Sequence, residues 1–222
     1  MATASDPPDS AVNPASGFIE IVDATLGVGS NYNIRHVVNP GGGDPPAVLV
    51  LSNNSLDDLD PRIRIGPGGD TWVVWWRDGS TDEVLCRVHD YSTDTWSSEH
   101  ALSTAEESAR NPEIVYDGTN AWVAYEFNTT EGIGIGVLGI EENPDPFGRD
   151  VVATTSFTGD VDTRIHAESG NLWVTWVDNA TYVGWSEYSH ATSSWASPGY
   201  ESYASDSVSA ARARVRTTVL NN

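Results

Sequence analysis

The chain has 222 residues, a length typical of one all-β domain, and 39% of them are hydrophobic, which is enough for a core of ordinary size. It contains 32 acidic and 11 basic residues, all of the latter arginine, and has a formal net charge of −21. This charge argues against nucleic acid as a partner and offers no basic patch to an anionic membrane, so we expect neither nucleic-acid binding nor membrane insertion.

The acidic excess also favours a high-salt environment, where salt screens the repulsion between carboxylates. The single cysteine, Cys86, excludes an intrachain disulfide framework and a zinc ribbon, and the acidic loops do not match a calcium loop, so we expect no metal and no cofactor. The first residues, MATASDPPDS, lack the basic and apolar regions of a signal peptide. We therefore expect no secretion by that route.

The N-terminal part of the sequence predicts a tail and then three strands. Residues 1–16 are rich in Pro, Asp and Ser, and we expect them to be held by a partner. Residues 18–22, 34–38 and 47–51 are short apolar runs separated by Gly, Pro and Asn, a pattern typical of strands. No first strand is recognisable ahead of them.

A repeat of 51 residues follows. Residues 60–63 (DPRI) recur as 111–114 (NPEI) and as 162–165 (DTRI). Each start is followed by an aromatic run, WVVW at 72–75, WVAY at 122–125 and WVTW at 173–176. Three units in fixed order indicate a repeat protein, with units near 60–110, 111–161 and 162–212.

Each unit predicts four antiparallel strands, as in residues 62–65, 71–77, 83–90 and 95–102. The run Trp72 to Trp76 does not alternate apolar with polar residues, which indicates a strand buried on both faces. A propeller blade is covered on both sides by its neighbours, whereas a sandwich strand with one wet face alternates. The pattern favours a small β-propeller, with an irregular β-sandwich as the alternative.

The two ends of the chain suggest how the ring closes. Residues 214–216 (RVR) reproduce 62–64 (RIR) and predict an innermost strand at 213–220. That strand and the N-terminal strands of residues 17–53 would form one closing blade. We therefore predict one domain over residues 17–222, a propeller of four blades with four strands each. The alternative is an open arc completed by other subunits.

The segment between the third and fourth strands, residues 91–96 (YSTDTW), resembles a degenerate Asp-box, the turn repeated in sialidase-like propellers. The counterparts at 142–147 and 189–195 depart further from that pattern. The resemblance implies a folding turn rather than an activity. In sialidase-like propellers three arginines hold a substrate carboxylate, which directs attention to the arginines of the innermost strands.

The innermost strands place several cations around one axis. The period of two gives one level with Arg62, Glu113, Arg164 and Arg214, and a second level with Arg64, Val115, His166 and Arg216. Guanidinium groups suit bidentate carboxylate binding, so we predict an anion site. Its residues are Arg62, Arg164, Arg214, Arg216 and His166. The alternative is internal neutralisation by Glu113, Asp60 and Asp162.

No catalytic set stands out among the carboxylates. Ordinary glycosidases need two carboxylates on either side of the scissile bond, and acidic residues are too abundant here for spacing to select a pair. Tyr116 and Glu126 can be nominated, but the neighbours of Glu126 place it in a buried strand. We therefore expect no enzyme and no catalytic residues.

The sequence leads to the expectation of a non-enzymatic recognition or attachment module on the surface of a halophilic assembly, such as a haloarchaeal virus particle. Its expected partners are other subunits, further copies of the chain, and an acidic cell-surface glycan. Its expected location is a virion or extracellular surface. The alternatives are a sialidase-like or other glycan-cleaving hydrolase and a cytoplasmic structural scaffold of a halophile.

Overall fold

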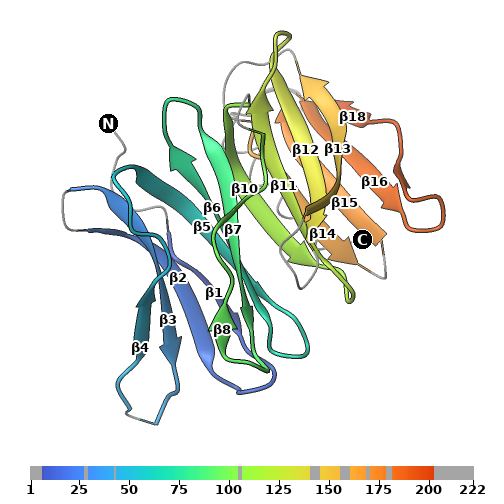
Figure 1. Ribbon diagram of the computed structural model, residues 1–222. Helices are drawn as coiled ribbons and strands as arrows, with labels where there is room; N and C mark the ends of the chain where they lie inside the picture. Colours follow the sequence, from blue (N-terminus) through green and yellow to red (C-terminus); the bar gives the residue numbers. More distant parts are fainter. Residues whose placement is uncertain are drawn as a thin grey trace.

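The computed structural model describes residues 7–27, 30–42, 44–104, 107–140, 146–155, 161–168, 171–178 and 182–202. Within these ranges the regular elements are strands, and no helix is present (Figure 1). The described part of the chain accordingly has no helix long and apolar enough to span a membrane. The predicted all-β class is confirmed.

The strands form four antiparallel sheets in chain order. The first contains β1 (Asp9–Val12), β2 (Ile19–Leu26), β3 (Tyr32–Asn39) and β4 (Ala47–Val50). The second contains β5 (Asp57–Ile65), β6 (Thr71–Asp78), β7 (Glu83–Asp90), β8 (Thr95–Trp96) and β9 (His100–Ala101). The third contains β10 (Ala109–Tyr116), β11 (Ala121–Asn128), β12 (Ile133–Ile140) and β13 (Pro146–Thr155). The fourth contains β14 (Arg164–Glu168), β15 (Asn171–Asp178), β16 (Tyr182–Ser189), β17 (Ser194–Trp195) and β18 (Gly199–Ser202).

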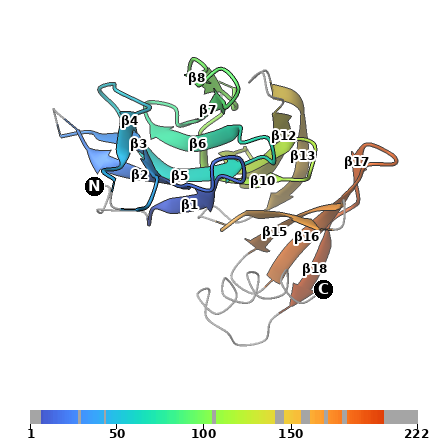
Figure 2. The same ribbon diagram turned by 90° about the horizontal axis from the view of Figure 1, so that it is seen from below.

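Consecutive sheets pack face to face, and their first strands are in contact. Strand β5 contacts β1, β10 contacts β5, and β14 contacts β10. Figures 1 and 2 show the sheets following one another in an arc, with the first and fourth sheets at its two ends. This arrangement is consistent with the blades of a β-propeller. Closure of the sheets into a ring stays a prediction.

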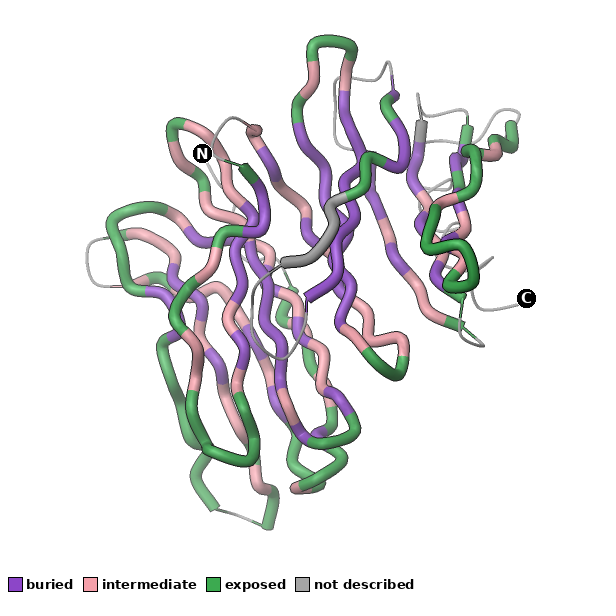
Figure 3. Tube along the Cα trace, turned by 45° about the vertical axis from the view of Figure 1, so that its right-hand side comes forward, coloured by how far each residue is buried: buried purple, intermediate pink, exposed green. Residues whose placement is uncertain are grey.

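Three apolar clusters fill the spaces between neighbouring sheets. Val22, Ile34, Ile63 and Trp75 belong to the cluster between the first and second sheets. Strand β6 contributes residues to this cluster and to the next one, so residues 71–75 are all buried, as the continuous apolar run predicts. Figure 3 shows the buried segments along the middle of the strands and the exposed segments at the turns.

The innermost strand of the first sheet differs from the prediction. Strand β1 pairs with β2, with Asp9 opposite Val22, and takes the place predicted for residues 213–220. Part of the predicted tail, residues 9–12, is thus held by the chain itself. The sequence DSAV has one large apolar residue, so it gives no strand pattern. Residues 203–222 lie outside the described residues.

The inner strands of the second, third and fourth sheets share one backbone feature. Asp60, Asn111 and Asp162 have φ angles of 50°, 52° and 48°. This left-handed conformation is one that Asp and Asn adopt more readily than most residues. In the second and third sheets it coincides with a shift of register, between Leu59 and Arg62 and between Arg110 and Glu113. Each of these three left-handed residues lies two positions before the charged residue of its inner strand.

Candidate functional site

Charged side chains gather where the innermost strands meet. We call this set the inner-strand cluster. It consists of Asp9, Asp60, Arg62, Arg64, Glu113, Asp162 and Arg164. Four sheets contribute to it, because β1, β5, β10 and the start of β14 each supply at least one member.

Glu113 is the centre of the cluster. Its Oε1 lies 3.1 Å from Nε of Arg62 and 3.0 Å from Nη1 of Arg164, so it joins the second, third and fourth sheets. Arg62 also pairs with Asp60 at 2.5 Å, and Arg164 pairs with Asp162. These five side chains form a continuous chain of alternating charge.

Asp9 and Arg64 form the second part of the cluster. Oδ2 of Asp9 accepts hydrogen bonds from Nη1 of Arg64 at 2.9 Å and from the Ile63 backbone N–H at 3.0 Å. The side chain of Asp9 is 26% exposed, against 13% for Glu113. Solvent therefore reaches Asp9 more readily than Glu113.

The electrostatics of the cluster are nearly balanced. Burial alone would lower the pKa of Arg62, but the charges of Glu113 and Asp60 outweigh it and raise that pKa above its ordinary value. Four carboxylates face three guanidinium groups, and each of these guanidinium groups has a carboxylate partner. The cluster thus has a small excess of negative charge.

The structure brings together two of the residues predicted for an anion site. Arg62 and Arg164 both contact Glu113, as the alternative of internal neutralisation describes. His166 lies two residues beyond Arg164 on β14, and its Nε2 is 4.0 Å from Glu168. Arg214 and Arg216 lie outside the described residues, and the binding of an anion by these five residues stays a prediction.

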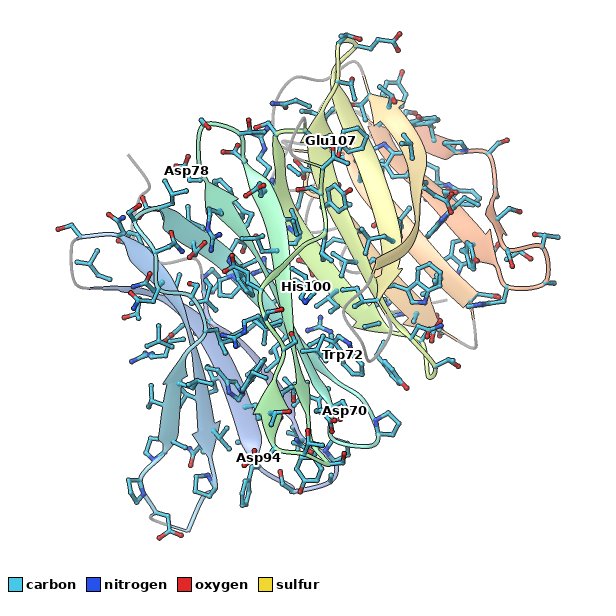
Figure 4. All side chains as sticks on the ribbon, viewed as in Figure 1. Asp70, Trp72, Asp78, Asp94, His100 and Glu107 are labelled. Carbon is cyan, nitrogen blue, oxygen red and sulfur yellow. The ribbon has the colours of Figure 1, made fainter. Side chains whose placement is uncertain are left out.

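Glu126 and Tyr116 have structural surroundings. Glu126 is fully buried, and its carboxylate accepts hydrogen bonds from the Asn111 side chain at 3.1 Å and from the backbone N–H groups of Thr163 and Val161 at 3.3 and 3.4 Å. It joins the third sheet to the segment before β14. Tyr116 stacks on Trp72, with ring centroids 5.5 Å apart. Figure 4 shows Trp72 at the junction of the second and third sheets.

Sequence reasoning missed Asp9. It lies 54 residues before Ile63, outside the repeat, and the only sequence signal for it is an acidic residue near a short apolar pair. Metal binding receives no support from the described residues, which contain no group of three or more His, Cys, Asp or Glu side chains placed to hold an ion.

Comparison with known proteins relates the chain to solved structures. No protein-family model matches the sequence, and no curated protein matches it. A protein of unknown function from Dyadobacter fermentans aligns with a TM-score of 0.61 and 12% identity, over 77% of this chain and 48% of that one. The endo-arabinase of Bacteroides thetaiotaomicron aligns with a TM-score of 0.57 and 13% identity, over 90% of this chain and 81% of that one. A thermostable family-43 glycoside hydrolase aligns with a TM-score of 0.51 and 11% identity, over 90% and 72%.

These similarities correct the functional prediction. At this level of identity they show the fold, and the endo-arabinase and the family-43 enzyme are glycan-cleaving proteins with that fold. The expectation of a non-enzymatic attachment module is therefore contradicted, and so is the expectation of no enzyme. Both rested on the lack of a recognisable catalytic set, but carboxylates brought together from distant strands leave no local motif in the sequence.

Proposed function

We propose that the protein cleaves glycosidic bonds at the inner-strand cluster, with Asp9 and Glu113 as its two working carboxylates. The observation that carries the proposal is that two partly exposed carboxylates from separate inner strands, Asp9 and Glu113, belong to one cluster and pair with arginines two residues apart on β5. Two carboxylates are the usual requirement for glycoside hydrolysis. The fold likeness to glycoside hydrolases supports this choice over other reactions.

The two carboxylates differ in their neighbours, and this assigns their roles. Two guanidinium groups stabilise the negative charge of Glu113, whereas Asp9 has one, from Arg64. We assign to Glu113 the ionised role, in which it takes a proton from the attacking water. Asp9, the more exposed of the pair, donates a proton to the glycosidic oxygen as the bond from C1 to that oxygen breaks. The water oxygen then bonds to C1, and the proton count balances.

The charge of the cluster favours a neutral glycan over an acidic one. Each guanidinium group already has a carboxylate partner, and one carboxylate is in excess. A substrate carboxylate would have to displace an internal one and would meet repulsion from the others. Linear arabinan, suggested by the endo-arabinase, is the first neutral polymer to test, and polygalacturonate is the acidic comparison.

The test is release of reducing ends from these polymers by the full chain and by Asp9→Asn and Glu113→Gln. We expect cleavage of the neutral polymer and a loss of at least about 100-fold in each variant, the low end for a lost acid or base. Asp23→Asn is the matched control. Asp23 also pairs with an arginine, Arg35, and has a similar exposed fraction of 24%, but it belongs to β2, the second strand of its sheet, and is not a member of the inner-strand cluster.

Full activity in Glu113→Gln would overturn the assignment. A folded chain that cleaves neither polymer, nor other neutral glycans such as galactan and xylan, would overturn the proposed function.

A further inference from the structure

The face of the fourth sheet that is turned away from the third carries two neighbouring tryptophans. For each sheet we call the face that is turned away from the preceding sheet its front face. On the fourth sheet, Trp173 of β15 and Trp185 of β16 have ring centroids 5.7 Å apart, at an interplanar angle of 44°. Leu172 and Val174 point the opposite way, into the core shared with the third sheet. Trp185 is 36% exposed.

The equivalent tryptophans of the two preceding sheets are covered by the next sheet. Trp72 of the second sheet stacks on Tyr116 of the third, and Trp122 of the third lies 5.1 Å from Tyr188 of the fourth, measured between ring centroids. Their exposed fractions are 3% and 4%. Trp173, at the same place in the repeat, contacts an aromatic ring of its own sheet instead.

The centre of the front face has also changed in composition. Facing residues there are Val74 and Cys86 in the second sheet, and Ala124 and Val137 in the third. All four are fully buried, as a contact between two sheets requires. The facing residues in the fourth sheet are Thr175 and Trp185. A hydroxyl-bearing side chain and a partly exposed indole replace two small apolar side chains, which makes this front face unlike the other two.

Two details indicate that the front face of the fourth sheet suits a polar ligand. Oγ1 of Thr175 is buried and, like several other buried polar atoms, has no hydrogen-bond partner among the described residues, so a ligand hydroxyl can supply one. Trp185 packs closely over Gly199 of β18, where an added Cβ would lie 2.5 Å from the indole ring. The indole therefore lies against the backbone of β18, which restricts its orientation.

We propose that this face binds sugar residues of a neutral polysaccharide, with one ring stacked on Trp185. The apolar side of a sugar suits the indole, and its hydroxyls suit Thr175 and Glu187, which faces Trp173 across the strands. This inference rests on the proposed function, because it takes the substrate polymer as the ligand.

The register links the front face of the fourth sheet to the inner-strand cluster. Arg164 of β14, Thr175 of β15 and Trp185 of β16 lie opposite one another in a single row across three strands. Two strand spacings separate the ends of this row, about 10 Å. A polymer lying along the row would reach from Trp185 to Arg164, which contacts Glu113.

The test measures binding without cleavage, in the full chain carrying Glu113→Gln. Retardation by linear arabinan in native gels gives the affinity. We expect Trp185→Ala to weaken binding about tenfold, equivalent to about 1.4 kcal/mol. Trp185→Tyr should restore most of that loss. The matched control is Tyr182→Ala, because Tyr182 lies on the same strand, is 44% exposed and faces the other side of the sheet.

Each outcome decides the proposal. Unchanged retardation in folded Trp185→Ala overturns it. A wild-type dimer that Trp185→Ala converts to monomer in sedimentation also overturns it, because a second copy would then be the occupant of the face. Binding that depends on Trp185 in a chain that cleaves no glycan would support the binding face on the fourth sheet and refute only the proposed hydrolysis.

Discussion

Two kinds of carboxylate can be compared in this molecule, and they differ in burial and in their main partners. The side chains of Glu20 and Glu126 lie between sheets, 6% and 0% exposed, and their oxygens accept hydrogen bonds from backbone N–H groups, amides, a hydroxyl and a histidine. The guanidinium group nearest to Glu126 is that of Arg110, with its Nε 4.0 Å from Oε2. Glu113 and Asp9 lie in the inner-strand cluster, are 13% and 26% exposed, and pair with guanidinium groups.

This difference separates the carboxylates that stabilise the fold from those that a ligand can reach. A buried carboxylate is tolerated only when several donors satisfy it, so Glu20 and Glu126 hold neighbouring sheets together and cannot exchange partners without opening the interface. A partly exposed carboxylate at the inner strands remains within reach of a ligand. Stability should therefore depend most on the first kind, and activity on the second.

The largest loss of stability should come from Glu126→Ala. It leaves the buried N–H groups of Val161 and Thr163 and the amide of Asn111 without their acceptor. We expect a loss of about 3 to 5 kcal/mol, at 1 to 3 kcal/mol for each unsatisfied buried donor and with partial relaxation. Urea denaturation followed by tryptophan fluorescence measures it.

Glu126→Gln is the control for that variant, because it keeps one acceptor oxygen and should lose less than half as much. An unfolding free energy for Glu126→Ala within about 1 kcal/mol of the wild type would show that this carboxylate does not stabilise the contact between the third sheet and the segment before β14.

The contrast between the two kinds of carboxylate also explains what the sequence could predict. The 51-residue spacing placed Arg62, Glu113 and Arg164 together, and the apolar run of Trp72 to Trp76 predicted a strand buried on both faces. Both signals are periodic. Asp9 lies outside the repeat. Its position is set by a hydrogen bond from the backbone N–H of Ile63, 54 residues further along the chain, and only the folded chain shows that contact.

The next effect concerns Glu20, which joins Asn13 and His36 to Thr71 of the second sheet. Burial alone would raise the pKa of Glu20, but hydrogen bonds from His36, Asn13 and Thr71 outweigh it and hold that pKa below the ordinary 4.5. We expect Glu20→Gln to lose about 2 kcal/mol at neutral pH, the scale of charge-assisted hydrogen bonds.

The pH dependence of that loss sharpens the test. Because the pKa is lowered in the folded state, the stabilisation by ionised Glu20 is complete above 4.5 and declines as the pH falls through the folded value. Urea midpoints of wild type and Glu20→Gln should therefore converge in acid. A gap that stays constant down to about pH 3 would contradict the assigned cause.

A smaller loss is expected for Arg164→Ala. Its side chain is 23% exposed, and Glu113 keeps Arg62 as a partner after the substitution. The expected cost is about 1.5 kcal/mol, between the values for exposed and fully buried ion pairs. Denaturation in urea gives the cost. A loss above about 4 kcal/mol would place Arg164 with the structural groups instead.

The smallest effect should be that of Arg64→Ala. The pair of Arg64 with Asp9 is 36% and 26% exposed, and Asp9 retains the Ile63 backbone N–H as a donor. An exposed pair contributes about 0.2 to 1 kcal/mol, and salt screens it. Salt also relieves the repulsion within a chain of net charge −21, so the quantity to follow is the difference between variant and wild type, not either stability alone. That difference should shrink towards zero at about 1 M salt, where the screening length is about 3 Å. A difference that persists unchanged would mean that Asp9 is held as firmly as Glu126, and the division between structural and working carboxylates would then fail at the residue assigned as proton donor.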